Sequence, residues 1–399
     1  MAFPINTEEA MAGQLPLPSP LDRPRGGRVG SAVEWNNVRR PEILDDFTRL
    51  MYGALPPRPE SVRFELRREL SGALGGIAKR REVRIHLAND GKTHFVDVLW
   101  YLPLHAEKPV PAIAGLNFPG NHAVSTEPDV YPTEASRLTQ PAERGAGASR
   151  WPFSELIRNG FSVITANRGD LFPDRADGRA ESVWKLFRTP EELTPEQRDC
   201  TAISAWAFGC ILLLELLESE PLIDRKRIWL HGHSRLGKTA LWVAANDPRF
   251  AGVVSNDSGC CGAALSRRNF GEHISFITET FPWWFRKVLD SYAGREAELP
   301  FDQHFLISLV APRPVLVASA TEDLWADPRG EFLAAKAAGE VYRLFGATGL
   351  GEEAEFPPPD RPLYGDGVGY YLRTGKHDVT LADWQFVLQF IEKSTNCSN

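Results

Sequence analysis

The sequence of 399 residues contains few cysteines, and their spacing is not that of a metal or disulfide framework. None of the five forms a CxxC pair with another, which argues against a zinc ribbon and against a disulfide scaffold. Because their number is odd, at least one thiol is left without a cysteine partner inside the chain. The five are Cys200, Cys210, Cys260, Cys261 and Cys397.

Basic clusters and long apolar runs are also missing. Lys+Arg total 45 against 52 for Asp+Glu, a net charge of −7, and no block of basic residues offers a nucleic-acid surface. No apolar run approaches about 18 residues, so no membrane-spanning helix is expected. Residues 1–6 contain no apolar signal-peptide stretch, and we expect no signal peptide in this chain.

Short apolar segments alternate with longer helical patterns. Residues 81–87 and 95–102 flank the turn Asn89-Asp90-Gly91, which is the signal of a β-hairpin. Alternation of strands and helices is typical of an α/β fold with a largely parallel sheet, here with an antiparallel hairpin at its edge. Further strands are predicted at 112–118, 161–167, 227–230, 252–255, 315–319 and 341–345, and helices at 198–218, 236–245 and 381–392.

The pattern along the chain predicts one main domain. Residues 1–60 are rich in proline and irregular, apart from a short helical pattern at 41–51, and we interpret them as an N-terminal extension packed on the body. No internal repeat or low-complexity linker interrupts residues 61–399, which are predicted to form a single catalytic domain. The Gly- and Pro-rich segment 346–366 is expected to be a surface loop over a site.

The segment 228–242 reads as strand, sharp turn and helix, and two kinds of chemistry fit it. Gly232, Gly237, Lys238 and Thr239 match the GxxxxGK[ST] pattern of a phosphate-binding loop. The rest of the chain fits this interpretation poorly, because such loops usually open their domain and favour small residues inside the turn.

The same segment also fits a nucleophile elbow, in which a serine on a tight strand-to-helix turn is exposed above the sheet. Ser234 would be that serine, and the helix behind it would direct N–H groups at developing negative charge. The usual pattern is GxSxG, whereas this chain has Leu236 at the fourth position and Gly237 one place later. The elbow alone leaves open the alternative that Ser234 only caps a helix.

A nucleophilic serine needs a histidine base and an acid to orient it, in the chain order Ser, acid, His. Of the nine histidines, only His377 lies in a late loop directly before the final helix. Two acids follow predicted strands, Asp257 and Asp323, where open α/β sheets place their sites. Each has an alternative as a turn or cap aspartate, and the residues themselves leave the choice open.

Four motifs follow one another along the second half of the chain. They are Gly-His-Ser-Arg-Leu-Gly-Lys at 232–238, Ser-Asn-Asp-Ser-Gly-Cys-Cys-Gly-Ala-Ala-Leu-Ser-Arg-Arg at 255–268, Ala-Pro-Arg-Pro-Val-Leu-Val-Ala-Ser-Ala-Thr-Glu-Asp-Leu-Trp-Ala-Asp-Pro at 311–328 and Arg-Thr-Gly-Lys-His at 373–377. In this order they resemble the bacterial glucuronoyl esterases, carbohydrate esterase family 15, and the resemblance extends over about residues 36–391. It implies an α/β-hydrolase fold, with a mostly parallel central sheet between helices in a three-layer sandwich.

The resemblance implies a serine esterase that uses neither metal nor cofactor. It would hydrolyse the ester between (4-O-methyl-)glucuronic acid of glucuronoxylan and lignin alcohols through a glucuronoyl-enzyme. We expect a monomer with no nucleic-acid or membrane partner, secreted or periplasmic because its substrate is an extracellular polymer. The alternatives are another carbohydrate esterase, such as an acetyl-xylan esterase, or a non-catalytic carbohydrate-binding relative.

The resemblance also implies roles for individual residues. Ser234 is the expected nucleophile, His377 the base and Arg235 the oxyanion donor, since a guanidinium is always charged and offers several donors. Asp257 and Asp323 are both expected to contribute as acids, with Asp323 favoured because many relatives carry the longer Glu at the first position. The expected substrate-binding residues are Lys238, Glu272, Trp325 and Arg268, with Trp283 or Trp284 near the same cleft.

Overall fold

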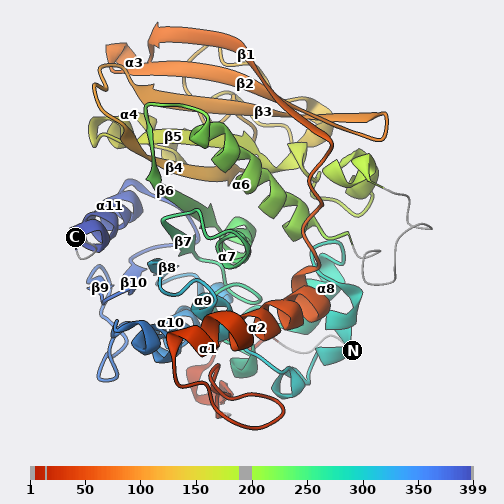
Figure 1. Cartoon of the computed structure of the whole chain (residues 1–399), viewed down its shortest axis with the longest axis vertical. Coiled ribbons are helices and arrows are strands. Elements are labelled where there is room, and N and C mark those ends of the chain that lie inside the picture. The colour runs from red at the N-terminus through yellow and green to blue at the C-terminus, as the bar shows by residue number, and fades with distance from the viewer. Residues whose placement is uncertain (1–4, 14–15, 188–199, 397–399) are drawn as a thin grey trace. The chain divides into compact units, whose positions relative to one another are not determined.

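The computed structural model describes residues 5–13, 16–187 and 200–396 (Figure 1). By its backbone contacts the chain divides into two compact units. The first unit comprises residues 1–53, 232–248 and 252–399, and the second comprises 54–231 and 249–251. The predicted extension thus contributes most of its length to the first unit, and its packing on a single domain stays a prediction.

The second unit is built on a sheet with the strand order β1-β2-β3-β5-β4-β6. The pairs from β1 to β5 are antiparallel, whereas β4 runs parallel to both β5 and β6. The hairpin predicted around Asp90 is confirmed, because Asn89 pairs with Lys92 across it. The elements are β1 (Ser61–Gly72), α3 (Ala73–Gly76), β2 (Ala78–Asn89), β3 (Lys92–Pro103), β4 (Val110–Asn117), α4 (Phe153–Arg158), β5 (Ser162–Asn167), α6 (Ala202–Glu218) and β6 (Ile223–His233).

Continuous apolar runs explain the central strands of this unit. Every residue of β5 is buried, as expected for a central strand that is covered on both faces. Helix α6 is apolar almost all round and packs against β4 and β5, and the Thr201 side chain caps it by accepting from the N–H of Ser204. The helix was predicted from Arg198, and residues 198 and 199 lie outside the described part of the chain.

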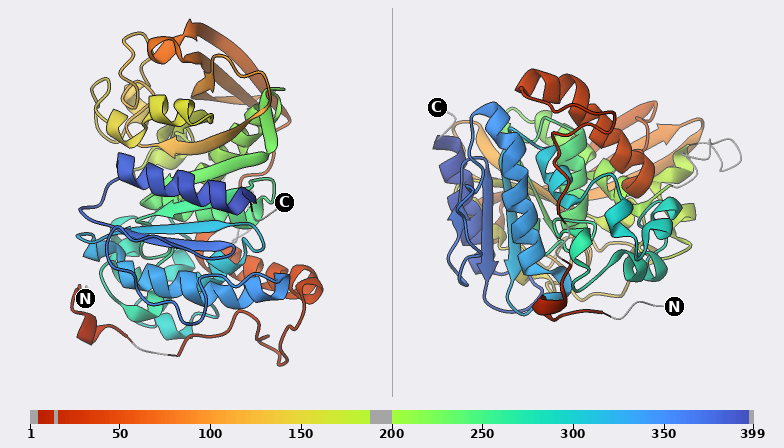
Figure 2. Two further views of the ribbon diagram at one scale, coloured as in Figure 1. Left: turned by 90° about the vertical axis from the view of Figure 1, so that its left-hand side faces the viewer. Right: turned by 90° about the horizontal axis from the view of Figure 1, so that it is seen from below.

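The first unit contains a second run of strands in the order β7-β8-β10-β9. The first three are parallel, and β9 pairs antiparallel with β10. Helices α11 and α10 lie on opposite faces of these strands (Figure 2). The elements are α1 (Ala32–Glu34), α2 (Arg40–Phe47), α7 (Arg235–Asn246), β7 (Gly252–Asn256), α8 (Ile274–Thr280), α9 (Gln303–Ser308), β8 (Val315–Ala320), α10 (Pro328–Tyr342), β9 (Leu363–Tyr364), β10 (Val368–Arg373) and α11 (Leu381–Asn396).

One predicted strand is wrong. Residues 341–345 do not form a strand, because Val341 and Tyr342 end helix α10 and the next three residues form a 3-10 turn. No glycine or proline interrupts the chain between Val341 and Phe345, and Gly346, with φ 85°, closes the turn. Both Val341 and Tyr342 are buried, so packing rather than β propensity decides the local structure.

None of the helices in the described part of the chain is both long and apolar enough to cross a membrane.

Candidate active site

Ser234 lies between the end of β6 and the start of α7, on a sharp turn. Its backbone has φ 56° and ψ −129°, a conformation that residues with a side chain seldom adopt. Its N–H donates to the carbonyl of Asn256 at 2.8 Å, which ties the turn to the end of β7. A Cβ atom at position 232 would lie 2.0 Å from the carbonyl oxygen of Leu236, so this turn requires Gly232.

Gly237 explains why the second glycine of the motif is displaced. A Cβ atom at this position would meet the Ser258 side chain at 2.9 Å and the Asn256 carbonyl oxygen at 3.2 Å. The glycine therefore lets the first turn of α7 pack closely against the residues that follow β7. In this departure from GxSxG, the second glycine lies on the face of α7 that contacts Asn256 and Ser258. The strained turn at Ser234 is unchanged.

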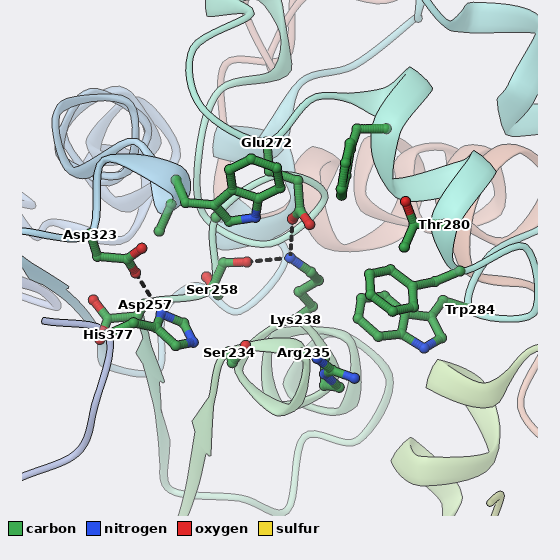
Figure 3. Close-up of a pocket in the computed structure, with 15 residues that line it drawn as sticks. Ser234, Arg235, Lys238, Asp257, Ser258, Glu272, Thr280, Trp284, Asp323 and His377 are labelled. Carbon is green, nitrogen blue, oxygen red and sulfur yellow. Dashed lines mark hydrogen bonds and ion pairs between the residues drawn. The ribbon is translucent and has the colours of Figure 1, made fainter. Parts of the chain in front are cut away.

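His377 and Asp323 form a hydrogen-bonded pair in the same region. The Nδ1 atom of His377 lies 2.5 Å from Oδ2 of Asp323. The Asp323 side chain is 5% exposed, whereas that of His377 is 40% exposed, so the imidazole faces the solvent side of a buried carboxylate. In Figure 3 the imidazole lies between Asp323 and Ser234. A neutral histidine held in this way can accept a proton at Nε2.

Asp257 lies close to this pair but makes different contacts. It is 2% exposed, its φ is 45°, and neither of its carboxylate oxygens has a hydrogen-bond partner among the described residues. Burial, together with the nearby carboxylates of Glu331 and Asp323, raises the pKa of Asp257 well above its usual range. Asp323, and not Asp257, is therefore the acid that contacts the imidazole of His377, and the expected contribution of both acids stays a prediction.

These three side chains are also the one group in the described ranges whose ligand atoms could jointly reach a metal ion. Single ligand atoms of Asp257, Asp323 and His377 lie within 4.8 Å of one another. Two of the three, His377 and Asp323, are already joined by the hydrogen bond between Nδ1 and Oδ2.

Arg235 follows the serine and lines the same cavity. Its guanidinium carbon lies 4.3 Å from the ring centre of Trp284 and 5.3 Å from that of Phe281. These two rings are stacked on each other at 3.9 Å with an interplanar angle of 3°. A cation over aromatic faces at this distance is attracted by their π systems, so the stack forms a platform that restrains the guanidinium.

Lys238 is buried one helical turn after the serine. Its Nζ atom donates to the carbonyl of Ser258 at 2.6 Å and to Oε2 of Glu272 at 3.2 Å. A lysine and a carboxylate side by side in a cavity can bind the hydroxyl groups of a sugar as donor and acceptor. The ion pair with Glu272 also disfavours the phosphate-loop interpretation. In such a loop the lysine binds the nucleotide phosphates, and the Glu272 carboxylate would repel them.

Trp325 and Glu272 are joined through the backbone, since the N–H of Glu272 donates to the carbonyl of Trp325 at 2.8 Å. The indole is 36% exposed and meets the Phe276 ring edge to face at 4.7 Å. A Cβ atom on Gly271 would lie 2.4 Å from the carbonyl oxygens of both Leu324 and Trp325, so the two loops approach closely only because a glycine stands there. This contact places an aromatic face beside a carboxylate.

A cavity of about 380 Å³ unites these residues, and all of them belong to the first unit. Eight of the nine predicted site residues line it, and Figure 3 shows the acids and His377 at one end and Trp284 at the other. Among the lining residues that were not predicted, Phe281 had a signal in the sequence. It belongs to the aromatic segment 281–285, and aromatic side chains often line sugar clefts. The lining residues not predicted are Ser258, Gly259, Phe276, Thr280, Phe281 and Ala326.

Arg268 is the predicted site residue that does not line the cavity. Its Nε and Nη2 atoms donate to the two carboxylate oxygens of Asp327 at 2.8 and 3.2 Å, and Nη2 also donates to Glu9 at 2.8 Å. The side chain is buried, with 8% of its surface exposed. Its donors thus join the start of α10 to the N-terminal segment, and its binding of substrate stays a prediction.

The sequence is similar to those of known carbohydrate esterases. Residues 131–346 match the family model described as glucuronyl esterase, fungi. A carbohydrate esterase of an unknown prokaryotic organism is 40% identical over 401 residues, which cover 97% of this chain and 91% of that protein. The 4-O-methyl-glucuronoyl methylesterase 1 of Wolfiporia cocos is 29% identical and covers 83% of this chain and 72% of its own.

A solved structure agrees over almost the whole length. The glucuronoyl esterase from Solibacter usitatus is 39% identical and superposes with a TM-score of 0.90 over 96% of this chain and 99% of that one. The similarity therefore extends well beyond the motifs around the serine.

Proposed function

Since the chain belongs to the glucuronoyl esterases, carbohydrate esterase family 15, we propose that it cleaves esters of (4-O-methyl-)glucuronic acid on glucuronoxylan with lignin alcohols. Membership in the family confirms the α/β-hydrolase fold and the carboxylic ester hydrolase activity predicted from the sequence. The observation that carries the proposal is that one cavity holds the strained Ser234, the His377–Asp323 pair and the Lys238–Glu272 pair.

The proposed reaction begins with proton transfer from Ser234 to His377. The serine oxygen attacks the ester carbonyl, and His377 then donates the proton to the departing alcohol, which leaves a glucuronoyl-enzyme. Water activated by the same histidine releases glucuronic acid. Asp323 keeps the imidazole in the tautomer that has Nδ1–H and stabilises it when it is charged.

Arg235 is proposed to stabilise the tetrahedral oxyanion. A guanidinium offers several hydrogen-bond donors to an oxyanion, and the place of Arg235 at the start of α7 adds the positive end of the helix dipole. Donors arranged before the reaction need no reorganisation when charge develops. The Trp284 platform supports this role because it restrains the guanidinium.

Lys238, Glu272 and Trp325 are proposed to bind the glucuronoyl ring. The Lys238 ammonium would donate charge-assisted hydrogen bonds to ring hydroxyls, and the Glu272 carboxylate would accept them from ring hydroxyls. The exposed indole face would cover the apolar face of the pyranose. Because the proposed substrate is an extracellular polymer, we also propose that the protein is exported. We further propose that it acts as a monomer and without a cofactor.

Hydrolysis of benzyl glucuronate compared with 4-nitrophenyl acetate tests the proposed substrate class. We expect the kcat/KM of the wild-type protein for the glucuronate ester to exceed that for the acetate by about 100-fold or more, the scale of two well-formed polar contacts. A preference for the acetate would instead favour an acetyl esterase. Binding of the sugar without hydrolysis of either ester would favour the non-catalytic alternative.

A further inference from the structure

Glu331 is a fully buried carboxylate on the first turn of α10, outside the set of cavity-lining residues. Its Oε1 atom accepts from the N–H of Ser258 at 2.9 Å, the hydroxyl of Ser258 at 3.0 Å and the N–H of Gly259 at 2.9 Å. Its Oε2 atom binds the hydroxyl of Ser319 at 2.6 Å. One side chain therefore joins α10 to the loop after β7 and to the end of β8.

The loop after β7 is shaped so that it needs such an acceptor. Asp257 has φ 45° and Gly259 has φ 59°, so the residues on both sides of Ser258 have left-handed backbone. The turn directs the N–H groups of Ser258 and Gly259 at one point, and Glu331 occupies that point. The Ser258 hydroxyl reinforces the turn, since it also accepts from the N–H of Ala263 at 2.9 Å.

The carbonyl of the same residue faces the cavity. The Ser258 carbonyl accepts from Nζ of Lys238 at 2.6 Å, and Nζ lies 3.2 Å from Oε2 of Glu272. A short path of hydrogen bonds thus runs from Glu331 through the Ser258 residue to Lys238. Figure 3 shows the two bonds at the lysine end of this path.

We propose that Glu331 is a positioning residue that holds Ser258 so that its carbonyl fixes Lys238 for binding the sugar ring. Glu331 touches neither the cavity nor the reacting atoms, and it acts on the substrate only through Ser258 and Lys238. The inference rests on the proposed role of Lys238 in binding the glucuronoyl group.

The hydrogen-bond pattern identifies a conservative replacement. All three donors from Ser258 and Gly259 converge on Oε1, while Oε2 meets only a hydroxyl, which can either donate or accept. In Glu331→Gln the amide oxygen can keep the first three bonds, and the amide nitrogen can donate to Ser319. Glu331→Leu keeps a similar volume but removes all four bonds.

The experiment measures KM and kcat of the full chain for benzyl glucuronate, and kcat/KM for 4-nitrophenyl acetate, which has no sugar ring. For Glu331→Leu we expect KM for the glucuronate ester to rise about tenfold, the effect of one misplaced hydrogen bond to a charged group. The acetate reaction should stay within about twofold of wild type, and Glu331→Gln should match wild type on both esters.

Glu340 offers a matched control on the same helix, since its carboxylate accepts from the Ser19 hydroxyl at 2.9 Å and does not line the cavity. Glu340→Leu should leave KM for benzyl glucuronate and kcat/KM for the acetate unchanged. If Glu331→Leu does not fold, Glu331→Asp withdraws the carboxylate by one methylene and should give the same selective rise in KM.

A double-mutant cycle tests the path itself. In a Lys238→Met background, Glu331→Leu should add little to KM, because both changes remove the same interaction. An equal rise in that background, an unchanged KM in Glu331→Leu, or a parallel loss on both esters would overturn the inference. Failure of the proposed function would look different, because the wild-type protein itself would then show no preference for the glucuronate ester.

Discussion

The Nδ1 atom of His377 lies 2.5 Å from Oδ2 of Asp323, whereas neither carboxylate oxygen of the adjacent Asp257 has a hydrogen-bond partner among the described residues. The residues themselves left the choice between the two acids open, and the resemblance favoured Asp323. In the structure Asp323 contacts the imidazole, and Asp257 is buried beside it with a raised pKa. We therefore expect losses of different size when the two side chains are replaced.

Asp323→Asn should lower kcat for benzyl glucuronate by about 100-fold or more, because an amide at this position favours the wrong imidazole tautomer. Asp257→Asn should lower kcat by less than about tenfold, since no hydrogen bond to His377 is lost. Both variants are compared at pH 7 after their melting temperatures have been measured. A larger loss of kcat in Asp257→Asn than in Asp323→Asn would mean that Asp257, and not Asp323, orients His377.

Asp257→Asn should also change stability in a pH-dependent way. Because burial raises the pKa of Asp257 in the folded protein, the folded state binds its proton more tightly than the unfolded chain does. The associated stability is present at low pH and is lost as the pH rises through the folded-state pKa, at about 1.4 kcal/mol per unit of pKa difference.

The amide cannot ionise, so Asp257→Asn should melt at a higher temperature than wild type at pH 8, with a smaller difference at pH 4. Thermal unfolding at the two pH values measures this. Equal shifts at both would mean that the carboxylate is not destabilised by burial.

Trp284→Leu should lower kcat for benzyl glucuronate about tenfold with little change in KM. A cation–π contact of this kind contributes about 0.5–2 kcal/mol, and its loss would leave Arg235 less ordered in the transition state. Trp284→Phe keeps an aromatic face and should retain most of the activity. The neighbouring Trp283 does not line the cavity, so Trp283→Leu serves as the control. Equal losses in Trp283→Leu and Trp284→Leu would indicate a packing defect rather than an effect on Arg235.

Lys238→Met should raise KM for benzyl glucuronate about 10- to 100-fold, because a charged donor to the ring is lost and Glu272 is left without its cation. Adding Glu272→Gln to Lys238→Met should restore the melting temperature, because it removes the buried carboxylate that has lost its cation. It should not restore KM for benzyl glucuronate. The acetate reaction should change little in both variants. Loss of acetate hydrolysis to the same degree would mean that Lys238 supports the chemistry rather than the sugar.

The sequence predicted most elements of the fold because their patterns are local. Buried parallel strands such as β8 appear as unbroken apolar runs, and the order of Ser234 and His377 along the chain predicted the base. Strand β1 was not predicted. Val62, Phe64 and Leu66 alternate with charged residues, but three charged residues in a row follow at 67–69, where the register to β2 shifts. The second half of β1 thus depends on pairs with the neighbouring strand, such as Glu69 with Arg81, that the local pattern does not reveal.

The remaining site contacts could not be predicted because they join residues far apart in sequence. Nothing local in the sequence indicates that Asp327 and Glu9 bind Arg268, or that Trp284 lies beneath Arg235. The choice between Asp257 and Asp323 likewise depends on a 2.5 Å contact across 54 positions. The order of the motifs could predict that these acids and His377 lie close together, but not which atoms are in contact.

The central claim is that Ser234 attacks the glucuronate ester, and Ser234→Ala tests it most directly. With benzyl glucuronate as substrate, we expect kcat to fall by about 10⁴-fold or more, as for loss of a catalytic nucleophile. Binding of glucuronic acid to the same variant should stay within about twofold of wild type, because the contacts proposed for the ring do not include this hydroxyl. Hydrolysis of the ester by Ser234→Ala at an appreciable fraction of the wild-type rate would contradict the account.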